Sequence, residues 1–178
     1  TGNKWTHRPF WPWLQEHGYD PDQIRKDIED AFVTVIMASR EIFLNQPNHR
    51  LSFELFGFDV MLDDKGKIYI LEINVTPALG TSSELDYFVK APVVRDLFNI
   101  CLLPKPNEAT NVIHNLFMNP ENNKKPEAAY AAICEYELTQ QRLGMFRCIY
   151  PTPDRVERLG PLLERHTDLD VALEQWVS

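Results

Sequence analysis

The stretch FELFGFDVMLDDKGKIYILEIN, residues 53–74, predicts the central element of this fold. Both of its halves are rich in Phe, Val, Ile, Leu and Tyr, whereas residues 64–67 between them have the composition of a turn. We therefore expect two antiparallel strands joined by a short loop. With a loop of four residues, Asp63 would pair with Ile68, and Met61 would pair with Ile70.

The same register places Asp59 opposite Glu72 and Gly57 opposite Asn74 on one face of the hairpin. Directly opposed like charges destabilise a strand pair, so a cation is expected between the two carboxylates. Two carboxylates and an amide oxygen suit Mg²⁺, with phosphates and water completing its shell. Gly57 would leave room for those phosphates. The alternative is two acids on a solvated face, and a register shift of one residue would separate them.

Residues 53–59 and 71–79 resemble the metal-binding end of the tubulin tyrosine ligase-like family, ATP-grasp enzymes that join an amino acid to a protein carboxylate. In that family an Asp, a Glu thirteen positions later and an Asn two positions after it bind the Mg²⁺ ions that bridge the ATP phosphates. Asp59, Glu72 and Asn74 match these positions. The resemblance therefore implies that these three residues are catalytic metal ligands, with Mg²⁺ and ATP as cofactors.

Other segments extend the resemblance along about the first hundred residues. Residues 83–100 are similar to the helix that follows the motif, residues 2–5 resemble an earlier family segment, and weaker similarity lies near residues 137–151. The resemblance implies an α+β fold: the C-terminal portion of an ATP-grasp fold, an antiparallel sheet with flanking helices, plus a helical extension.

A change of composition after Leu103 predicts a domain boundary near residue 105, because prolines and asparagines become frequent there. Residues 1–104 would be the ligase segment, and residues 105–178 an irregular connection with a helical extension. Helical patterns are expected over the segments 22–44, 83–100, 126–143, 154–165 and 167–177. The aromatic stretch from Trp5 to Trp13 is expected to be a loop, because Pro9 and Pro12 interrupt it.

Composition places the chain among ordinary globular proteins, with 44% hydrophobic and 25% charged residues in 178. A net charge of −8 argues against nucleic acid or an anionic membrane as partner. No apolar run is long enough to span a bilayer. We therefore expect a cytoplasmic protein, and the resemblance adds microtubules, cilia or flagella as associated structures. Because the chain opens on Thr1 rather than Met, we expect a fragment.

The function implied by the resemblance is ligation of a free amino acid to a protein carboxylate through an acyl-phosphate. Glutamate is the expected amino acid, with tyrosine and glycine left open, and the acceptor would be tubulin or another acidic protein tail. Val75 and Lys90 are the expected substrate-binding residues. Relatives that elongate glutamate chains often carry a histidine after the Asn, so Val75 predicts that this enzyme starts a branch on an unmodified glutamate.

An alternative from another class is a non-catalytic interaction module that keeps the fold without complete nucleotide binding. ATP-grasp folds hold the nucleotide between two lobes, and the family residues that grip it precede this segment, which is therefore expected to be inactive alone. The two opposed acids favour the ligase, because a module freed from catalysis has no reason to retain a repulsive pair. Nucleotide-gripping lysines upstream would separate the two hypotheses.

Overall fold

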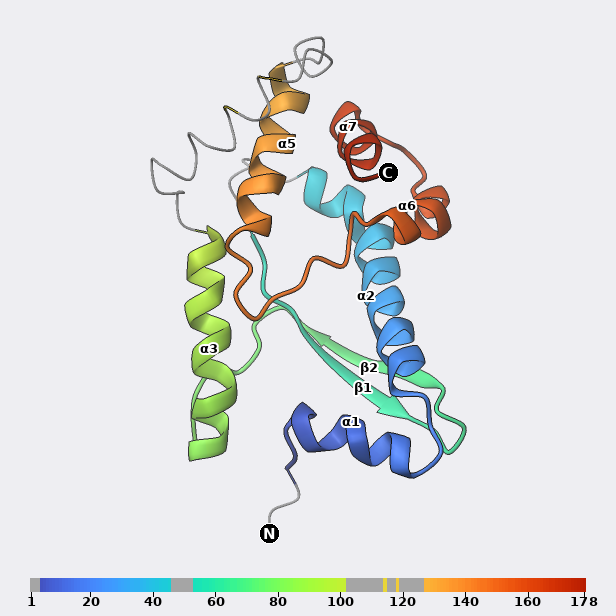
Figure 1. Ribbon diagram of the computed structural model, residues 1–178, viewed down its shortest axis with the longest axis vertical. Coiled ribbons are helices and arrows are strands. Elements are labelled where there is room, and N and C mark those ends of the chain that lie inside the picture. Colours follow the sequence, from blue (N-terminus) through green and yellow to red (C-terminus); the bar gives the residue numbers. More distant parts are fainter. Residues whose placement is uncertain (1–3, 46–52, 102–113, 115–117, 119–126) are drawn as a thin grey trace. The chain divides into compact units, whose positions relative to one another are not determined.

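The computed structural model describes residues 4–45, 53–101, 114, 118 and 127–178 (Figure 1). They form two compact units, Thr1–Val89 and Lys90–Ser178. The elements in chain order are α1 (His7–Glu16), α2 (Pro21–Leu44), β1 (Gly57–Leu62), β2 (Ile68–Asn74), α3 (Glu84–Cys101), α5 (Glu127–Gln140), α6 (Pro153–Leu159), a 3-10 turn (Gly160–Leu162) and α7 (Asp168–Val177). Helices with a small antiparallel sheet confirm the α+β class. The expected boundary at residues 104–105 lies outside the described residues.

The first helix, α1, shows that the loop expected between Trp5 and Trp13 was a wrong prediction. Pro9 lies in the first turn of α1, where a backbone N–H has no partner within the helix. Pro9 therefore costs the helix no hydrogen bond, and Pro12, further along, removes one. The buried side chain of Leu14, 3% exposed, anchors the helix in the first unit.

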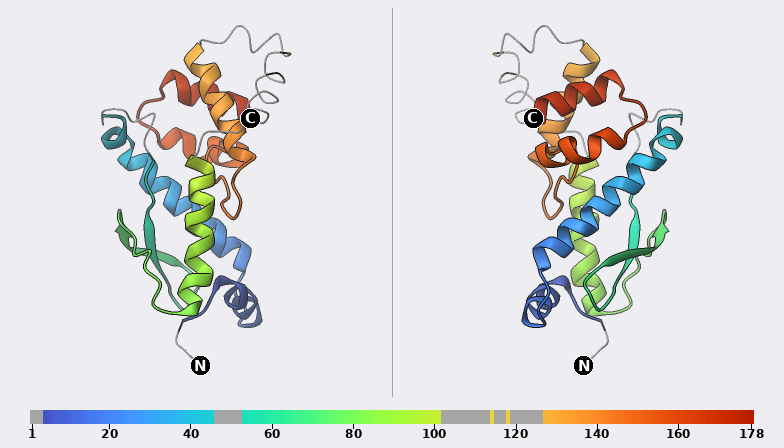
Figure 2. Two further views of the ribbon diagram at one scale, coloured as in Figure 1. Left: turned by 90° about the vertical axis from the view of Figure 1, so that its left-hand side faces the viewer. Right: turned by 90° about the vertical axis from the view of Figure 1, so that its right-hand side faces the viewer.

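The long helix α2 confirms the prediction for residues 22–44 and begins at a capped N-terminus. The Asp20 carboxylate accepts hydrogen bonds from the backbone N–H groups of Asp22 and Gln23 at 3.0 and 3.1 Å. Figures 1 and 2 show α2 running beside the hairpin of β1 and β2. The rings of Phe32 on α2 and Phe58 on β1 stack with centroids 4.1 Å apart, so α2 packs against the hairpin face that carries Phe58.

The hairpin loop has five residues rather than the four expected. The N–H of Asp63 donates to the carbonyl of Lys67 at 3.0 Å, and the Asp63 carboxylate accepts from the N–H groups of Lys65 and Lys67, both at 2.9 Å. These bonds hold the pKa of Asp63 below its usual value, and the bond from the N–H of Lys67 has the largest effect. Asp63 is therefore part of the loop, and β1 ends one residue earlier than expected, at Leu62. The predicted pairs of Asp63 with Ile68 and of Met61 with Ile70 are wrong.

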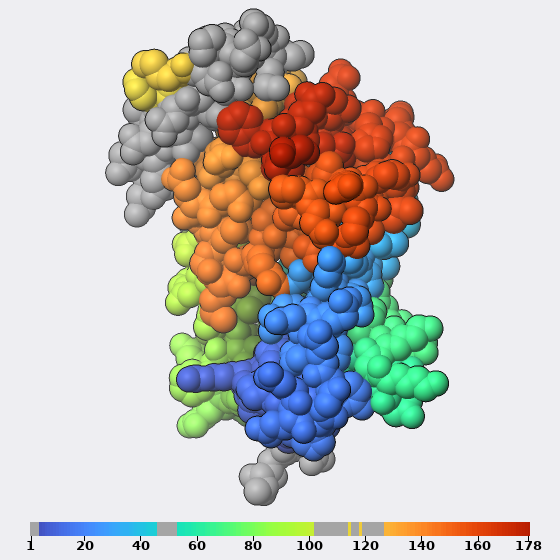
Figure 3. Space-filling view, turned by 45° about the vertical axis from the view of Figure 1, so that its right-hand side comes forward, coloured from blue at the N-terminus to red at the C-terminus, as the bar shows by residue number. Residues whose placement is uncertain are grey.

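The tip of the hairpin packs against the connection between α1 and α2. Gly66 is buried with a φ of 78°, and a Cβ added there would lie 3.1 Å from Cδ1 of Tyr19. The hydroxyl of Tyr19 donates to the carbonyl of Asp64 at 3.1 Å. Figure 3 shows the hairpin (green) at the surface beside α1 and α2 (blue). These contacts fix one end of the two strands to the helical part of the first unit.

The second unit has its core between α5 and α7. Ile133 and Leu138 are 1% and 9% exposed and pack with Leu173 and Trp176. Figure 2 shows α6 and α7 beside α5. The predicted helices at 126–143 and 167–177 are confirmed, the latter with a capping box between Thr167 and Asp170.

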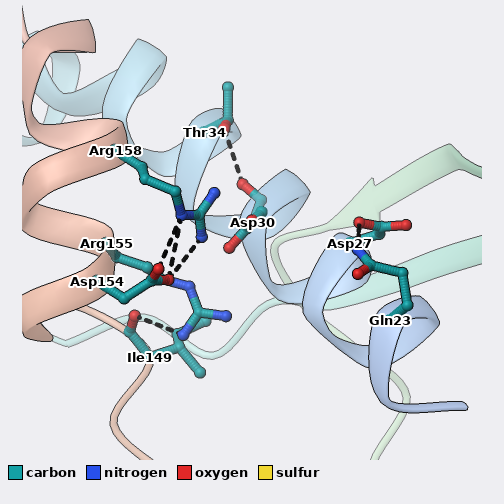
Figure 4. A network of polar contacts seen from close by, with 8 residues as sticks. All are labelled: Gln23, Asp27, Asp30, Thr34, Ile149, Asp154, Arg155 and Arg158. Atoms are coloured by element: carbon teal, nitrogen blue, oxygen red, sulfur yellow. Dashed lines mark hydrogen bonds and ion pairs between the residues drawn. The ribbon is translucent and has the colours of Figure 1, made fainter.

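The predicted helix 154–165 is shorter than expected. It ends at Leu159 and continues as the 3-10 turn Gly160–Leu162, which contains Pro161. Figure 4 shows its first turns held by two arginines. Arg158 forms an ion pair with Asp154 at 2.8 Å, and Arg155 donates to the carbonyl of Ile149 at 3.2 Å.

A buried carboxylate joins α3 to the segment that follows α5 within the second unit. Asp96 is 2% exposed and accepts hydrogen bonds from Nε of Arg95 at 2.7 Å and from the N–H of Met145 at 2.8 Å. The Arg95 guanidinium first, and then the Met145 N–H, hold the pKa of Asp96 below its usual value. Gly144 has a φ of 57°, and any Cβ there would overlap the Asp96 carboxyl group. Glycine is therefore required for this contact.

No helix within the described ranges has both the length and the apolar character needed to cross a membrane.

The docking of the hairpin tip generates a stability prediction for two glycines of the same unit. Gly66→Ala should destabilise the protein by about 2–4 kcal/mol, because left-handed strain adds to the displacement of Tyr19. Gly18→Ala is the matched control: Gly18 has a φ of 85° with nothing within 4 Å of an added Cβ. It should cost only about 1 kcal/mol of strain. Urea denaturation of both variants measures the difference, and equal losses would show that the tip is not docked.

Candidate functional site

A β-bulge in β2 determines which side chains of the hairpin share a face. From the loop inward, Leu62 pairs with Ile68, Met61 with Tyr69, and Val60 with Ile70. The register then shifts by one residue between Val60 and Asp59, which leaves Leu71 as the extra residue of β2. An extra residue in one strand moves the side chains beyond it to the opposite face of the sheet from the one they would otherwise occupy.

Beyond the bulge, Asp59 pairs with Glu72 and Gly57 pairs with Asn74, as the sequence predicted. The two acids therefore lie directly opposite each other on the exposed face of the hairpin. Between the pair of Asp59 with Glu72 and the pair of Gly57 with Asn74 lies the pair of Phe58 with Ile73. Phe58 and Ile73 belong to the other face, where Phe58 stacks on α2. The predicted pairing of the three candidate ligands is thus present.

Among the residues that the structure describes, no cationic side chain neutralises the two opposed acids. Over the ranges that the structure describes, neither Asp59 nor Glu72 has a hydrogen bond or an ion pair through its side chain. No group of three or more His, Cys, Asp or Glu side chains suited to a metal lies in the same described residues. Any cation here would be held by two carboxylates and one amide oxygen.

This donor set fits Mg²⁺. The ion takes hard oxygen ligands and keeps several positions for water and substrate phosphates, so one or two protein carboxylates are sufficient. Asp59 and Glu72 would supply carboxylate oxygens, and Asn74, at the end of β2, would supply an amide oxygen. The exposed, uncompensated pair would also be relieved of its mutual repulsion by a bound divalent cation.

The structure gives Gly57 a different role from the one expected. A Cβ added at Gly57 would lie 3.0 Å from Cβ of Pro77 and 3.7 Å from Cβ of Asn74. The space beside Gly57 is therefore filled by the chain that leaves β2, and the expectation that it leaves room for phosphates is wrong. Gly57 instead permits a close approach of Pro77 to the first residue of β1.

The two expected substrate-binding residues lie in different parts of the chain. Val75 follows β2 directly and is 58% exposed. Lys90 is half-buried in α3 and falls in the second compact unit. The structure thus places Val75 next to the candidate metal ligands along the chain.

Sequence reasoning missed two residues that support the site: Leu71, which forms the bulge, and Pro77, which packs against Gly57. Asp63 has the residue type of a turn former, and it sets the length of the hairpin loop by accepting hydrogen bonds from the backbone that follows it. Leu71 is 62% exposed, and the sequence around it carries no signal for a bulge.

Comparisons with known proteins agree with the motif. The model of the Tubulin-tyrosine ligase family matches residues 1–110. Tubulin monoglutamylase TTLL4 of Homo sapiens is 35% identical over 113 residues, which cover 60% of this chain and 9% of the relative. Tubulin polyglutamylase TTLL13 of Mus musculus is 30% identical over 182 residues, covering 88% of this chain and 22% of the relative. The chain thus spans a small part of the curated relatives that it matches.

A further relative extends over nearly the whole chain. Tubulin polyglutamylase ttll-4 of Caenorhabditis elegans is 24% identical over 209 residues, which cover 97% of this chain and 35% of the relative. Similarity to these proteins therefore continues into residues 127–178, beyond the match of the family model.

The uncompensated pair generates a prediction about stability in the absence of metal. In metal-free buffer of low ionic strength, Glu72→Gln should stabilise the protein, by less than about 1 kcal/mol, because it removes the cross-strand repulsion. Added Mg²⁺ should raise the melting temperature of the wild type more than that of the variant. Thermal unfolding with and without Mg²⁺ measures both effects.

Glu54→Gln is the control for that measurement. Glu54 is exposed, precedes β1 and loses the same charge, but it faces no acid across the hairpin. A Glu72→Gln variant that is less stable than Glu54→Gln without metal would contradict the repulsion argument.

Proposed function

The chain belongs to the tubulin-tyrosine ligase family, and we propose that the protein catalyses the ATP- and Mg²⁺-dependent ligation of glutamate to a glutamate side chain of tubulin. The observation that carries the proposal is the opposed, uncompensated pair of Asp59 and Glu72 with Asn74 beside it. The names of the relatives, monoglutamylase and polyglutamylase of tubulin, support glutamate as the donor and tubulin as the acceptor. A cytoplasmic location at microtubules is part of the proposal.

The proposed role of the three residues is to hold Mg²⁺ at the end of the hairpin. Asp59 and Glu72 would supply carboxylate oxygens and Asn74 an amide oxygen, and the bound ion would neutralise charge on the γ-phosphoryl group during its transfer. The hairpin fixes the ligands because each is held in a strand, and the strands are tied to α2 by the stacked rings of Phe32 and Phe58. Ligands on rigid elements do not need to be ordered during the reaction.

The proposed reaction activates the acceptor carboxylate as an acyl-phosphate. The amine of free glutamate then displaces phosphate and forms the amide, so that no side chain of the protein becomes covalently attached. The acidic tail of the acceptor would be repelled by a chain of net charge −8, and its binding therefore requires cations gathered locally or on other parts of the protein.

The catalytic role of the metal ligands is tested by Glu72→Gln in the full-length protein. Loss of one ligand should lower kcat for glutamate ligation by about 10²–10³-fold, as removal of a group that stabilises transition-state charge does. Incorporation of radiolabelled glutamate into tubulin at saturating Mg²⁺ measures it, with Glu54→Gln as control. Unchanged activity of Glu72→Gln would remove Glu72 from the site. An absence of ADP release by the wild type with any acceptor would favour an interaction module instead.

Val75 generates a prediction about the acceptor. An apolar side chain after Asn74 cannot hydrogen-bond the carboxylate of an existing branch, so the full-length enzyme should modify an unmodified tail peptide in preference to a preglutamylated one. The ratio of kcat/KM for the two matched peptides measures the preference, and Val75→His should move it toward the preglutamylated peptide. A wild-type preference for the preglutamylated peptide would defeat the proposal.

A further inference from the structure

The loop that joins Asn74 to α3, residues 75–83, borders the candidate metal site and is mostly exposed. It is rich in small residues, and such a loop samples many conformations unless contacts fix it. Its first part is fixed by Pro77, which packs against Gly57. Any group that fixes its other end therefore controls the position of the residues between them.

Asp86 fixes that other end. Its carboxylate accepts hydrogen bonds from the hydroxyl of Ser82 at 2.6 Å and from the N–H of Ser82 at 3.3 Å. The same carboxylate lies 3.5 Å from Nζ of Lys4, which comes from the segment before α1. The Asp86 side chain is 13% exposed, whereas that of Lys4 is 73% exposed, so the bonds to Ser82 are the better shielded from solvent.

These contacts go beyond the capping of a helix. Asp86 is the third residue of α3, and its N–H donates to the hydroxyl of Ser83 at 3.1 Å, which is the usual cap contact. In a capping box the carboxylate would return to the N–H of Ser83. Here it reaches one residue further, to both donors of Ser82, and it also meets Lys4. Asp86 thus joins three segments: the loop, the helix and the chain before α1.

The charge of Asp86 persists over the whole working range of pH. The hydroxyl of Ser82 is the largest cause that lowers its pKa, to about 2. Because the folded pKa lies below the usual value, the contribution of the carboxylate is present above pH 4 and is lost only as the pH falls toward 2. The Asp86 carboxylate is therefore charged at neutral pH.

We propose that Asp86 is a positioning residue that holds the loop 75–83 in the place where it receives the acceptor peptide, beside the metal ligands. The inference rests on the proposed function. Since the metal ligands Asp59, Glu72 and Asn74 lie in the strands and not in the loop, loss of Asp86 is expected to change the KM for the acceptor more than the KM for ATP. Loosening the loop costs acceptor binding and alignment, because a displacement of about 1 Å lowers the rate by up to about 100-fold.

The test compares substitutions that remove different contacts in the full-length protein. Asp86→Ala removes the carboxylate contacts with Ser82 and Lys4 but keeps the backbone N–H that donates to Ser83. Asp86→Asn keeps an oxygen that accepts from Ser82, and Thr167→Ala removes only the side-chain cap of α7. Asp86→Ala should raise the KM for an unmodified tail peptide by about 10- to 100-fold and leave the KM for ATP within about twofold. Asp86→Asn should restore most of the affinity. Thr167→Ala should lower the melting temperature without changing the KM for the peptide.

A second readout does not depend on activity. Hydrogen exchange of peptides that cover residues 75–83 should be faster in Asp86→Ala than in the wild type, and close to wild type in Asp86→Asn. Should Asp86→Ala fail to fold, Ser82→Ala, which removes the shortest bond, takes its place in both measurements.

The outcomes separate this inference from the proposed function. Suppose that the wild type ligates glutamate. The role of Asp86 would then be overturned if Asp86→Ala, or Ser82→Ala in its place, kept the wild-type KM for the peptide and the wild-type hydrogen exchange. Equal increases in the KM values for peptide and ATP would also overturn it, because they indicate general damage. A wild-type protein that ligates nothing contradicts the proposed function. In that case the hydrogen exchange of residues 75–83 still tests the role of Asp86, and unchanged exchange in the variant would overturn it.

Discussion

The candidate site depends on one extra residue in β2. The hairpin loop sets the pairs of Leu62 with Ile68 and of Met61 with Tyr69, and without a bulge the same register would place Leu71 opposite Asp59. Glu72 would then pair with Phe58 and point toward the face that packs on α2. A carboxylate against that apolar face would lose its hydration without a partner. The bulge at Leu71 instead returns Glu72 to the exposed face, opposite Asp59.

That arrangement is unfavourable for folding and useful for binding a cation. Two like charges directly across a strand pair repel, and in the described part of the protein no cationic side chain compensates them. The stacking of Phe32 on Phe58 and the docking of Gly66 against Tyr19 hold the hairpin despite the repulsion. Local instability offset by packing elsewhere is the pattern expected of a functional site.

The sequence predicted the pairing of the acids correctly, but for a reason that was only partly right. The expected loop of four residues gave the correct register at Asp59 and a wrong one at Met61, and the bulge accounts for the difference. Helix ends with an adjacent cap signal, such as Asp20 before α2 and Thr167 before α7, were predictable because their bonds are local. The contact of Asp96 with Met145 was not, because it joins residues 49 positions apart.

The proposal that Asp59 and Glu72 share one cation can be tested by locating Mn²⁺ as a substitute for Mg²⁺. Crystals of the full-length protein grown with Mn²⁺ and a non-hydrolysable ATP analogue would locate the ion by its anomalous scattering. We predict an anomalous peak within about 2–2.5 Å of a carboxylate oxygen of both residues, the distance range of hard-cation ligands. An ion bound elsewhere, or the two side chains on opposite faces of the hairpin, would contradict it.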